Sequence, residues 1–188
     1  MTINSRGFVS DKENVVHEWA MFQLLQRHVT SPLGIQFERT YVHTPGAVAI
    51  VAVTDDGQMA LVEQYRASFG GYVLEIPAGM RDVDGEDPEV TACRELREEA
   101  GMDATHIELL GECLSSPGVT DSSVLVYLAT GLTNVGMQPH GPEEDAMILH
   151  WFSFSRALEM VEAGEITDAK SAYGILLAAR RFPDLVDK

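Results

Sequence analysis

Residues Gly79–Met102 read GMRDVDGEDPEVTACRELREEAGM and contain the signals that begin and end a helix. Asp87 is a favourable N-cap residue, and the proline that follows it suits the first position of a helix. Gly101 can adopt the left-handed backbone conformation in which many helices end. The segment therefore predicts a helix from Pro88 to Ala100, preceded by a polar loop.

Two faces of this expected helix differ in chemistry. An apolar stripe at helical spacing is formed by Ala92, Cys93, Leu96 and Ala100, which we expect to be buried. Glu95, Glu98 and Glu99 fall within an arc of roughly 100° on another face. Like charges at i,i+4 repel by about 0.2–0.5 kcal/mol on an isolated helix, so such a face is either solvated or bound to cations. Hard oxygen ligands favour Mg²⁺ or Mn²⁺.

The spacing of the surrounding residues resembles the Nudix box. Glu86, a gap of seven residues and then RELREEAGM from Arg94 carry this resemblance, and Gly79 supplies the glycine that precedes the first glutamate. The loop between Gly79 and Glu86 is one residue longer than is usual in the family, which leaves the register of the helix intact. The resemblance implies a metal-dependent hydrolase of nucleoside diphosphates linked to another moiety.

The resemblance also implies roles for individual residues. Metal ions would be held by Glu95, Glu98, Glu99 and the main-chain carbonyl of Ala78. Glu98 is expected to be a catalytic residue as well. Structural roles are implied for Gly79, Glu86, Arg94 and Gly101. Arg94 would orient the helix glutamates, and Glu86 would stabilise the start of the helix, where acidic groups are favoured. Mg²⁺ is the expected ion and Mn²⁺ the alternative.

The composition of the chain limits its partners and its location. With 188 residues the chain can form one domain and a small appendage, and a formal net charge of −16 argues against nucleic acid or an anionic membrane as partner. A small phosphate substrate remains compatible, because metal ions and one or two arginines can supply local positive charge. Two cysteines provide no disulfide framework, and we expect a cytoplasmic protein without a signal peptide or a membrane span.

We expect a small β-rich N-terminal piece over residues 1–44. Its first 13 residues are polar, and Val15–Val29 and Ile35–Val42 have the composition of strands, separated by a Ser-Pro-Leu-Gly turn. A piece of this size is marginal for forming its own core, so we expect it to pack against a second chain in a homodimer.

Residues 45–188 are expected to form the Nudix domain. The continuous apolar run Ala47–Val53 is typical of a strand buried on both faces. Further strands are expected at Met59–Tyr65, Tyr72–Ile76, Ile107–Leu114, Ser123–Thr130 and Met147–Phe154, and helices at Ser155–Ala163 and Asp168–Arg181. The pattern predicts a mixed sheet with helices on both faces, an α/β/α sandwich, which the Nudix resemblance also implies.

The substrate is suggested by features outside the box. Pro117 stands at about the distance from the box that marks the ADP-ribose pyrophosphatase subfamily, and Glu63–Arg66 and Glu75–Gly79 resemble that subfamily as well. A Nudix hydrolase of another nucleotide sugar such as GDP-mannose, a nucleoside-triphosphatase and a non-catalytic ADP-ribose sensor remain alternatives. Triphosphatases usually lack N-terminal strands, and sensors tend to lose box glutamates, all of which are present here.

Further substrate contacts follow from the subfamily resemblance. Arg66 occupies the position of a phosphate-binding arginine, and Phe22 and Arg39 lie near the positions that contact adenine, with Trp19 as a competitor for stacking. The loop Gly131–Ala146 is long for a compact domain and contains three consecutive acidic residues. The resemblance implies that one of them activates or positions water, with Glu144 the first choice and Glu143 the second.

Overall fold

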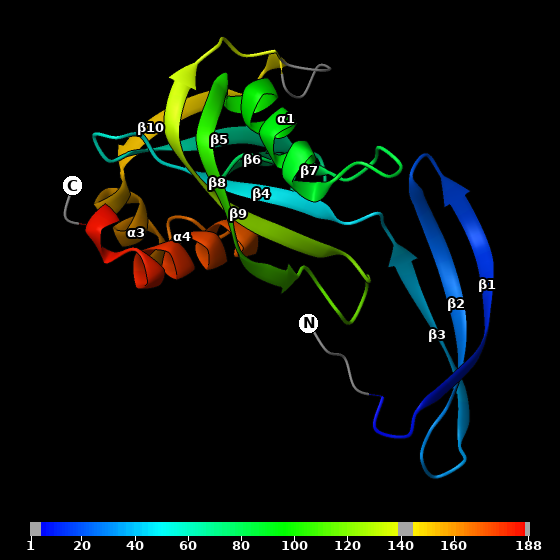
Figure 1. The fold of residues 1–188 in the computed structure, drawn as a ribbon. Coiled ribbons are helices and arrows are strands. Elements are labelled where there is room, and N and C mark those ends of the chain that lie inside the picture. The colour runs from blue at the N-terminus through cyan, green and yellow to red at the C-terminus, as the bar shows by residue number, and fades with distance from the viewer. Residues whose placement is uncertain (1–4, 139–144, 187–188) are drawn as a thin grey trace. The chain divides into compact units, whose positions relative to one another are not determined.

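The computed structural model describes residues 5–138 and 145–186, which divide into two compact units (Figure 1). The N-terminal unit runs to Gly46 and also takes in Leu114–Ser123, whereas the larger unit contains Ala47–Cys113 and the chain from Val124 onward. The sequence analysis placed the end of the N-terminal piece at residue 44 and did not include the second segment. That segment joins the N-terminal unit through main-chain bonds, including one of 2.8 Å from Val42 N to Val119 O.

The N-terminal unit is a three-stranded antiparallel sheet in the order β1-β2-β3. Its strands are β1 (Val9–Trp19), β2 (Phe22–Thr30) and β3 (Gln36–His43). The expectation of one strand over Val15–Val29 is therefore wrong. A turn at Ala20 and Met21 separates two strands, and Ala20 has a positive φ of 48°. β1 is exposed on both faces and has two register shifts, so its sequence lacks the alternation that identifies a strand.

The described residues of the larger unit form two sheets and the three α-helices named below. One sheet has the order β10-β5-β6 and the other the order β7-β4-β9-β8, in which β4 and β9 are parallel. The strands are β4 (Ala47–Ala52), β5 (Gln58–Arg66), β6 (Gly71–Glu75), β7 (Ala78–Met80), β8 (Met102–Leu114), β9 (Ser123–Asn134) and β10 (Ile148–Ser153). The helices are α1 (Pro88–Ala100), α3 (Phe154–Glu162) and α4 (Ala169–Arg181), followed by a 3₁₀ turn at Pro183–Leu185. β8 begins directly after the helix-ending glycine, earlier than the sequence indicated.

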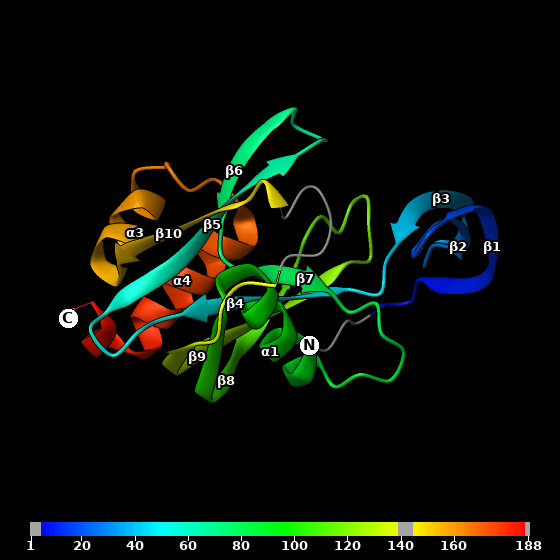
Figure 2. The ribbon, with the colours of Figure 1, turned by 90° about the horizontal axis from the view of Figure 1, so that it is seen from above.

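The sheets of this unit lie between α1 on one side and α3 and α4 on the other (Figures 1 and 2). The side chains of β4 alternate between the two layers, as the period of a strand requires. Val48 and Ile50 pack with Leu96 of α1, whereas Val51 packs with Ile175 of α4. This arrangement confirms both the strand buried on two faces and the predicted α/β/α sandwich. None of the helices in the described residues is long and apolar enough to cross a bilayer.

Helix α1 has the two ends that its sequence predicted. The Asp87 carboxylate accepts a hydrogen bond of 2.9 Å from Glu89 N, and Gly101 takes the left-handed conformation with φ 65°. Leu96 and its apolar neighbours on the stripe are buried, but Cys93 is only half-buried, so the expectation that Cys93 belongs to the core is wrong. Cys93 instead lines a surface hollow together with Val90 and Arg97 of the same helix.

Gly174 of α4 lies where the helix passes closest to the sheet, and its replacement tests this packing. A Cβ at this position would lie 2.9 Å from Cγ1 of Val126 and 3.0 Å from Cγ2 of Val51. Gly174→Ala should therefore lower the free energy of unfolding by about 1–3 kcal/mol, the usual cost of overpacking, although the same change stabilises an exposed helix. Urea unfolding measures the change.

Leu176→Ala on the exposed face of α4 is the matched control and should change the free energy of unfolding by about 0.5 kcal/mol or less. A Gly174→Ala variant that is as stable as the parent would contradict the close packing of α4 on β4 and β9.

Candidate active site

The backbone of β7 touches the acidic face of α1. A Cβ placed on Gly79 would lie 2.0 Å from Cδ of Glu95, so only a glycine leaves room for this carboxylate. The neighbouring Ala78 N–H donates a hydrogen bond of 2.8 Å to Oε2 of Glu99. Both glutamates are buried, with exposed fractions of 6% for Glu95 and 3% for Glu99. The helix face is therefore built into the domain and is not a solvated acidic surface.

Arg94 supplies positive charge to this face. Its Nη1 donates to Glu95 Oε1 at 2.7 Å and to Glu98 Oε2 at 3.1 Å. Its Nη2 forms longer ion pairs with Glu86 at 3.5 Å and Asp82 at 3.6 Å. Burial alone would lower the pKa of Arg94, but the surrounding carboxylates, Glu95 foremost, raise it above its ordinary value. Arg94 thus holds the helix glutamates and the preceding loop together.

Glu86 ties the loop to the first turn of α1. Its Oε2 accepts a hydrogen bond of 2.8 Å from the hydroxyl of Thr91 and also faces Arg94. These contacts join the loop to the helix start, which is the segment that the family resemblance expects Glu86 to stabilise.

The charges of this cluster suit a divalent cation. The guanidinium of Arg94 pairs with four carboxylates, those of Asp82, Glu86, Glu95 and Glu98, and the carboxylate of Glu99 on the same helix accepts a bond from the backbone of β7. Within residues 5–138 and 145–186, no three acidic, histidine or cysteine side chains are already gathered around one point as metal ligands. The donor set nevertheless fits Mg²⁺ or Mn²⁺, because carboxylate oxygens are the ligands that hard ions prefer.

Arg66, the candidate for the diphosphate, lies at the end of β5 and is bound by a glutamate of β6. Its Nε donates a hydrogen bond to Oε1 of Glu75 and its Nη2 donates one to Oε2, each of 2.7 Å. The side chain of Glu75 is only 4% exposed. Burial alone would raise the pKa of Glu75, but its bonds to Arg66 and Lys170 hold it below the ordinary value. The sequence analysis named Glu75 only as the first residue of the Glu75–Gly79 resemblance, without a role of its own, and it did not name Lys170.

The short segment that links β6 to β7 is fixed by three different elements. Ile76 N donates to the hydroxyl of Ser171 on α4 at 2.9 Å, and Ile50 N of β4 donates to Pro77 O at 2.8 Å. Ala78 N is held by Glu99 of α1, as described above. The backbone carbonyl that the resemblance implies as a metal ligand, that of Ala78, therefore sits in a segment with little freedom to move.

The N-terminal unit contains a hollow of about 540 Å³ on one face of its sheet. Arg27, Arg39 and Tyr41 line it from the strands, and Pro117 lines it from the segment 114–123. The Tyr41 hydroxyl donates to Glu13 at 2.7 Å and accepts from Arg27, and burial together with the bond to Glu13 raises the pKa of Tyr41 to about 12. The hollow thus brings together two predicted residues, Arg39 and Pro117.

Phe22 does not join Arg39 in this hollow. Strand alternation places Phe22 on the face of β2 opposite to that of Arg27, which pairs directly with Arg39. Phe22 instead packs beside Trp19 across the turn, with ring centroids 5.9 Å apart. One chain therefore does not assemble the expected pair of adenine contacts on a single surface.

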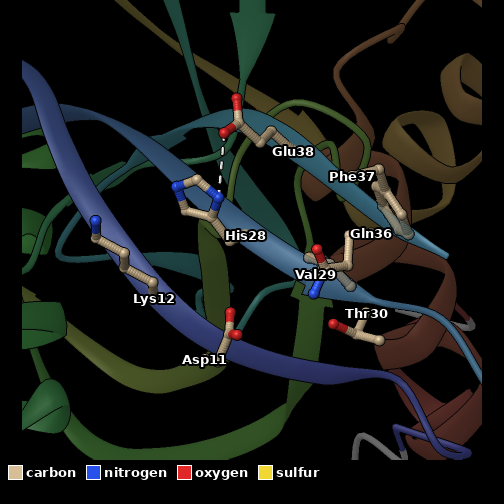
Figure 3. Close-up of a pocket in the computed structure, with 8 residues that line it drawn as sticks. All are labelled: Asp11, Lys12, His28, Val29, Thr30, Gln36, Phe37 and Glu38. Carbon is tan, nitrogen blue, oxygen red and sulfur yellow. Dashed lines mark ion pairs between the residues drawn. The ribbon is translucent and has the colours of Figure 1, made fainter. Parts of the chain in front are cut away.

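A second hollow in the N-terminal unit, of about 320 Å³, has a mixed lining (Figure 3). Lys12 and His28 contribute basic groups and Asp11 and Glu38 acidic ones, and the His28 Nδ1 lies 3.1 Å from Glu38 Oε1. Because charges of both signs line it, this hollow offers no net attraction for a phosphate group.

The two glutamates predicted to activate water, Glu143 and Glu144, lie outside the described residues. On the described side of this loop, Gln138 N donates a hydrogen bond of 3.2 Å to the main-chain oxygen of Glu98, and Val135 N donates to Gly101 O at 2.8 Å. The chain therefore enters the loop from beside the carboxyl-terminal half of α1.

Comparison with known proteins identifies the family. The NUDIX domain model matches residues 43–172, and this chain belongs to the Nudix family. The chain is 41% identical over 169 residues to the ADP-ribose pyrophosphatase of Mycobacterium tuberculosis, and the alignment covers 90% of this chain and 82% of that protein. It is 37% identical over 155 residues to the ADP-ribose pyrophosphatase of Bacillus subtilis, and this alignment covers 82% of this chain and 83% of that protein.

A solved structure of an ADP compounds hydrolase has the same fold. It superposes with a TM-score of 0.82 over 97% of this chain and 98% of that chain, at 19% sequence identity. The Nudix box resemblance and the fold class inferred from the sequence are both confirmed by these comparisons.

Replacement of Arg94 tests whether it balances the buried carboxylates. Arg94→Gln should lower the free energy of unfolding by about 1–3 kcal/mol, because it leaves partly buried negative charges without their cation. The raised pKa of Arg94 means that its contribution is complete below the unfolded-state pKa and is lost only in strong alkali. The deficit should therefore be equal at pH 7 and pH 9, and millimolar Mg²⁺ or Mn²⁺ should reduce it.

Arg97→Gln on the same helix is the matched control. Among the described residues, the ion pair that Arg97 forms is with Asp103, and both side chains are exposed. It should change stability by about 0.5 kcal/mol or less. Equal losses in the two variants, or a loss in Arg94→Gln that Mg²⁺ and Mn²⁺ leave unchanged, would contradict this assignment.

Proposed function

We propose that this Nudix protein hydrolyses ADP-ribose, or a closely related ADP-sugar, to AMP and ribose 5-phosphate in a reaction that depends on Mg²⁺, with Mn²⁺ as a substitute. The observation that carries the proposal is the acidic face of α1, where Glu95 and Glu99 meet the backbone of β7 and Arg94 pairs with Glu95 and Glu98. The substrate is supported by the two relatives that are ADP-ribose pyrophosphatases at 41% and 37% identity.

The reaction is a displacement at phosphorus by water. The oxygen of water forms a bond to one phosphorus, the bond from that phosphorus to the bridging oxygen breaks, and the proton from water passes to a base. Catalysis of such a step consists mostly of positioning and charge neutralisation. When bound, Mg²⁺ would supply Lewis-acid stabilisation of the phosphoryl oxygens and lower the pKa of a bound water.

The protein residues divide these tasks between them. Glu95, Glu98, Glu99 and the carbonyl of Ala78 would hold the ions, and Arg94 would keep the glutamates in place before the ions bind. Arg66 would bind the diphosphate, since an arginine offers donors in a planar fork that matches phosphate oxygens. Recognition of adenine would belong to the N-terminal unit, with Arg39 in the hollow beside Pro117 and Phe22 on the opposite face of the sheet.

A substrate panel tests the proposal. Hydrolysis of ADP-ribose and GDP-mannose would be followed by phosphate release, with a phosphatase that attacks the monoester products but not the intact diphosphates, and hydrolysis of ATP by direct chromatography of the nucleotide product. ADP-ribose with Mg²⁺ should give the highest kcat/KM. Preference for GDP-mannose or ATP would favour the other hydrolase alternatives, and ADP-ribose binding without turnover would favour a sensor. Glu99→Gln is the control and should lose at least about a hundredfold in turnover.

The loop that follows Gln138 supplies the proposed base. Its described entrance is bonded to the main chain of Glu98, which supports a position near the metal ligands. Glu144→Gln should lower kcat and kcat/KM together by about two orders of magnitude or more, with little change in KM, because a base acts in the transition state. If Glu144→Gln has no effect, Glu143→Gln should show this loss.

Steady-state kinetics with ADP-ribose measures these changes, and Asp145→Asn is the neighbouring control, which should retain activity within about tenfold of the parent. Activity within tenfold of the parent in both glutamate variants and in the double variant would rule out this loop as the source of the base.

We also propose that the protein is a homodimer built through the N-terminal unit. Among the described residues of that unit, Leu25 is the single buried hydrophobic side chain, at 5% exposed. Trp19 is 43% exposed, and Phe8, Val15 and Val16 are exposed as well. A three-stranded sheet with so little core gains its stability from a further surface. In such a dimer, Phe22 of one chain could contact adenine at a site to which the other chain contributes Arg39.

Light scattering measures the assembly. At micromolar concentration we expect a particle of about 41 kDa, twice the chain mass of 20.6 kDa. Trp19→Lys should shift the particle toward the monomer, because it buries a charge in the proposed interface. Leu176→Lys, at an exposed position of α4, is the control. A parent protein of about 20 kDa under these conditions would refute the dimer.

We place the protein in the cytoplasm. Both cysteines, Cys93 and Cys113, are free thiols in the structure, which agrees with a reducing compartment. The same compartment contains the nucleotide sugars that the proposed reaction consumes.

A further inference from the structure

An ion pair between β6 and the start of α4 lies outside the glutamates of α1. Lys170 Nζ donates to Glu75 Oε2 and, at 3.0 Å, to Asp168 Oδ2. The side chain of Lys170 is 15% exposed and that of Glu75 is 4% exposed. Lysine is almost never buried to this extent unless it is paired, and nothing in the proposed reaction has so far used this pair.

Glu75 is shared between two cations. Its Oε1 accepts from Arg66 Nε at 2.7 Å, and its Oε2 accepts from Arg66 Nη2 at 2.7 Å and from Lys170 Nζ. Both cations therefore draw on the same carboxylate. If Glu75 and Arg66 formed the pair alone, the charge of Arg66 would be cancelled and would give little net attraction for a diphosphate.

Asp168 offsets only part of the charge of Lys170. Asp168 is the N-cap of α4, and its Oδ2 accepts from both the N–H and the hydroxyl of Ser171, at 3.0 Å and 2.5 Å. Its charge is thus compensated in part by the positive end of the helix. The charge of Lys170 then remains available to Glu75.

Arg66 lies within electrostatic reach of the Nudix helix. Its bond to Glu75 raises the pKa of Arg66 above its ordinary value, and the charge of Glu99 contributes to the same shift. The segment after Glu75 also continues directly to Ala78, which is bonded to Glu99. The cluster of Arg66, Glu75 and Lys170 therefore borders the residues assigned to the metal ions.

We propose that Lys170 is a positioning residue for diphosphate recognition: it neutralises Glu75 and so leaves Arg66, which Glu75 orients, with a net positive charge for the substrate. This inference rests on the proposed function. Lys170 does not itself contact the substrate in this scheme, and its effect passes through the carboxylate of Glu75. Arg66 provides the contact and Glu75 sets the direction of its guanidinium.

A double-mutant cycle separates this role from direct contact and from a structural role. Lys170→Met removes the charge but keeps an apolar stem of similar length. It should raise KM for ADP-ribose by about ten- to a hundredfold, the scale for loss of one member of a buried charge pair, with a smaller effect on kcat. In a Glu75→Gln background there is no charge left to neutralise, so Lys170→Met should change KM by about twofold or less.

Two controls accompany the cycle. Lys170→Arg keeps the charge and should restore KM to within about threefold of the parent. Arg181→Met removes a positive charge from the exposed end of the same helix and should leave KM unchanged. Thermal unfolding of every variant shows whether the fold is retained.

An effect of Lys170→Met on KM that persists in full in the Glu75→Gln background would overturn the proposal, because Lys170 would then act on the substrate directly. Failure of Lys170→Arg to rescue KM, or a loss of kcat and thermal stability without the KM effect, would also overturn it.

Failure of the proposed function can be distinguished from failure of this inference. Titration calorimetry with α,β-methylene ADP-ribose measures diphosphate affinity without turnover, and the same cycle can be carried out on its Kd. A parent protein that binds the analogue but does not hydrolyse ADP-ribose would refute the function, and a Lys170 effect on Kd that vanishes with Glu75→Gln would still support the inference. A Kd that does not depend on Lys170 would refute the inference alone.

Discussion

The site depends on the approach of the β7 backbone to the acidic face of α1. Gly79 has no side chain, and this leaves the space that the carboxylate of Glu95 occupies. The next N–H along the strand, that of Ala78, holds Glu99. The caps of α1 at Asp87 and Gly101 and the pairing of β7 with β4 all serve to fix this approach. Negative charges could not be gathered in so buried a place without Arg94, which bonds to two of the helix glutamates.

The segment between Glu75 and Gly79 connects this approach to the rest of the larger unit. α4 holds it through Ser171 and Lys170, β4 through Ile50, and α1 through Glu99. Rigid support of this kind is what a reaction that depends on positioning requires, because a displacement of about 1 Å can cost a hundredfold in rate. The acidic cluster and the arginine of β5 are thus held by one short piece of backbone, and the two parts of the proposed chemistry share the same support.

The sequence predicted the features that local patterns encode. The ends of α1 follow from a cap residue, a proline and a glycine, and the burial of β4 on both faces follows from an unbroken apolar run. The division between β1 and β2 was missed because β1 is exposed on both faces and its register is interrupted. The contribution of Lys170 was missed for a different reason, since it lies 95 residues from Glu75 in the chain. Long-range pairs of this kind leave no periodic signal, and the same holds for residues 114–123 in the N-terminal unit.

The most direct test of this account is the divalent-cation affinity of Gly79→Ala. The three heavy atoms nearest to the added methyl all belong to the carboxylate end of Glu95, a side chain with flexible torsions, so the fold should survive. We expect a Tm close to that of the parent, while Mn²⁺ affinity measured by calorimetry and kcat for ADP-ribose fall together by about a hundredfold. Gly71→Ala, which has open space around it, should match the parent in all three quantities. A Gly79→Ala protein that binds Mn²⁺ and turns over ADP-ribose as the parent does would contradict the account.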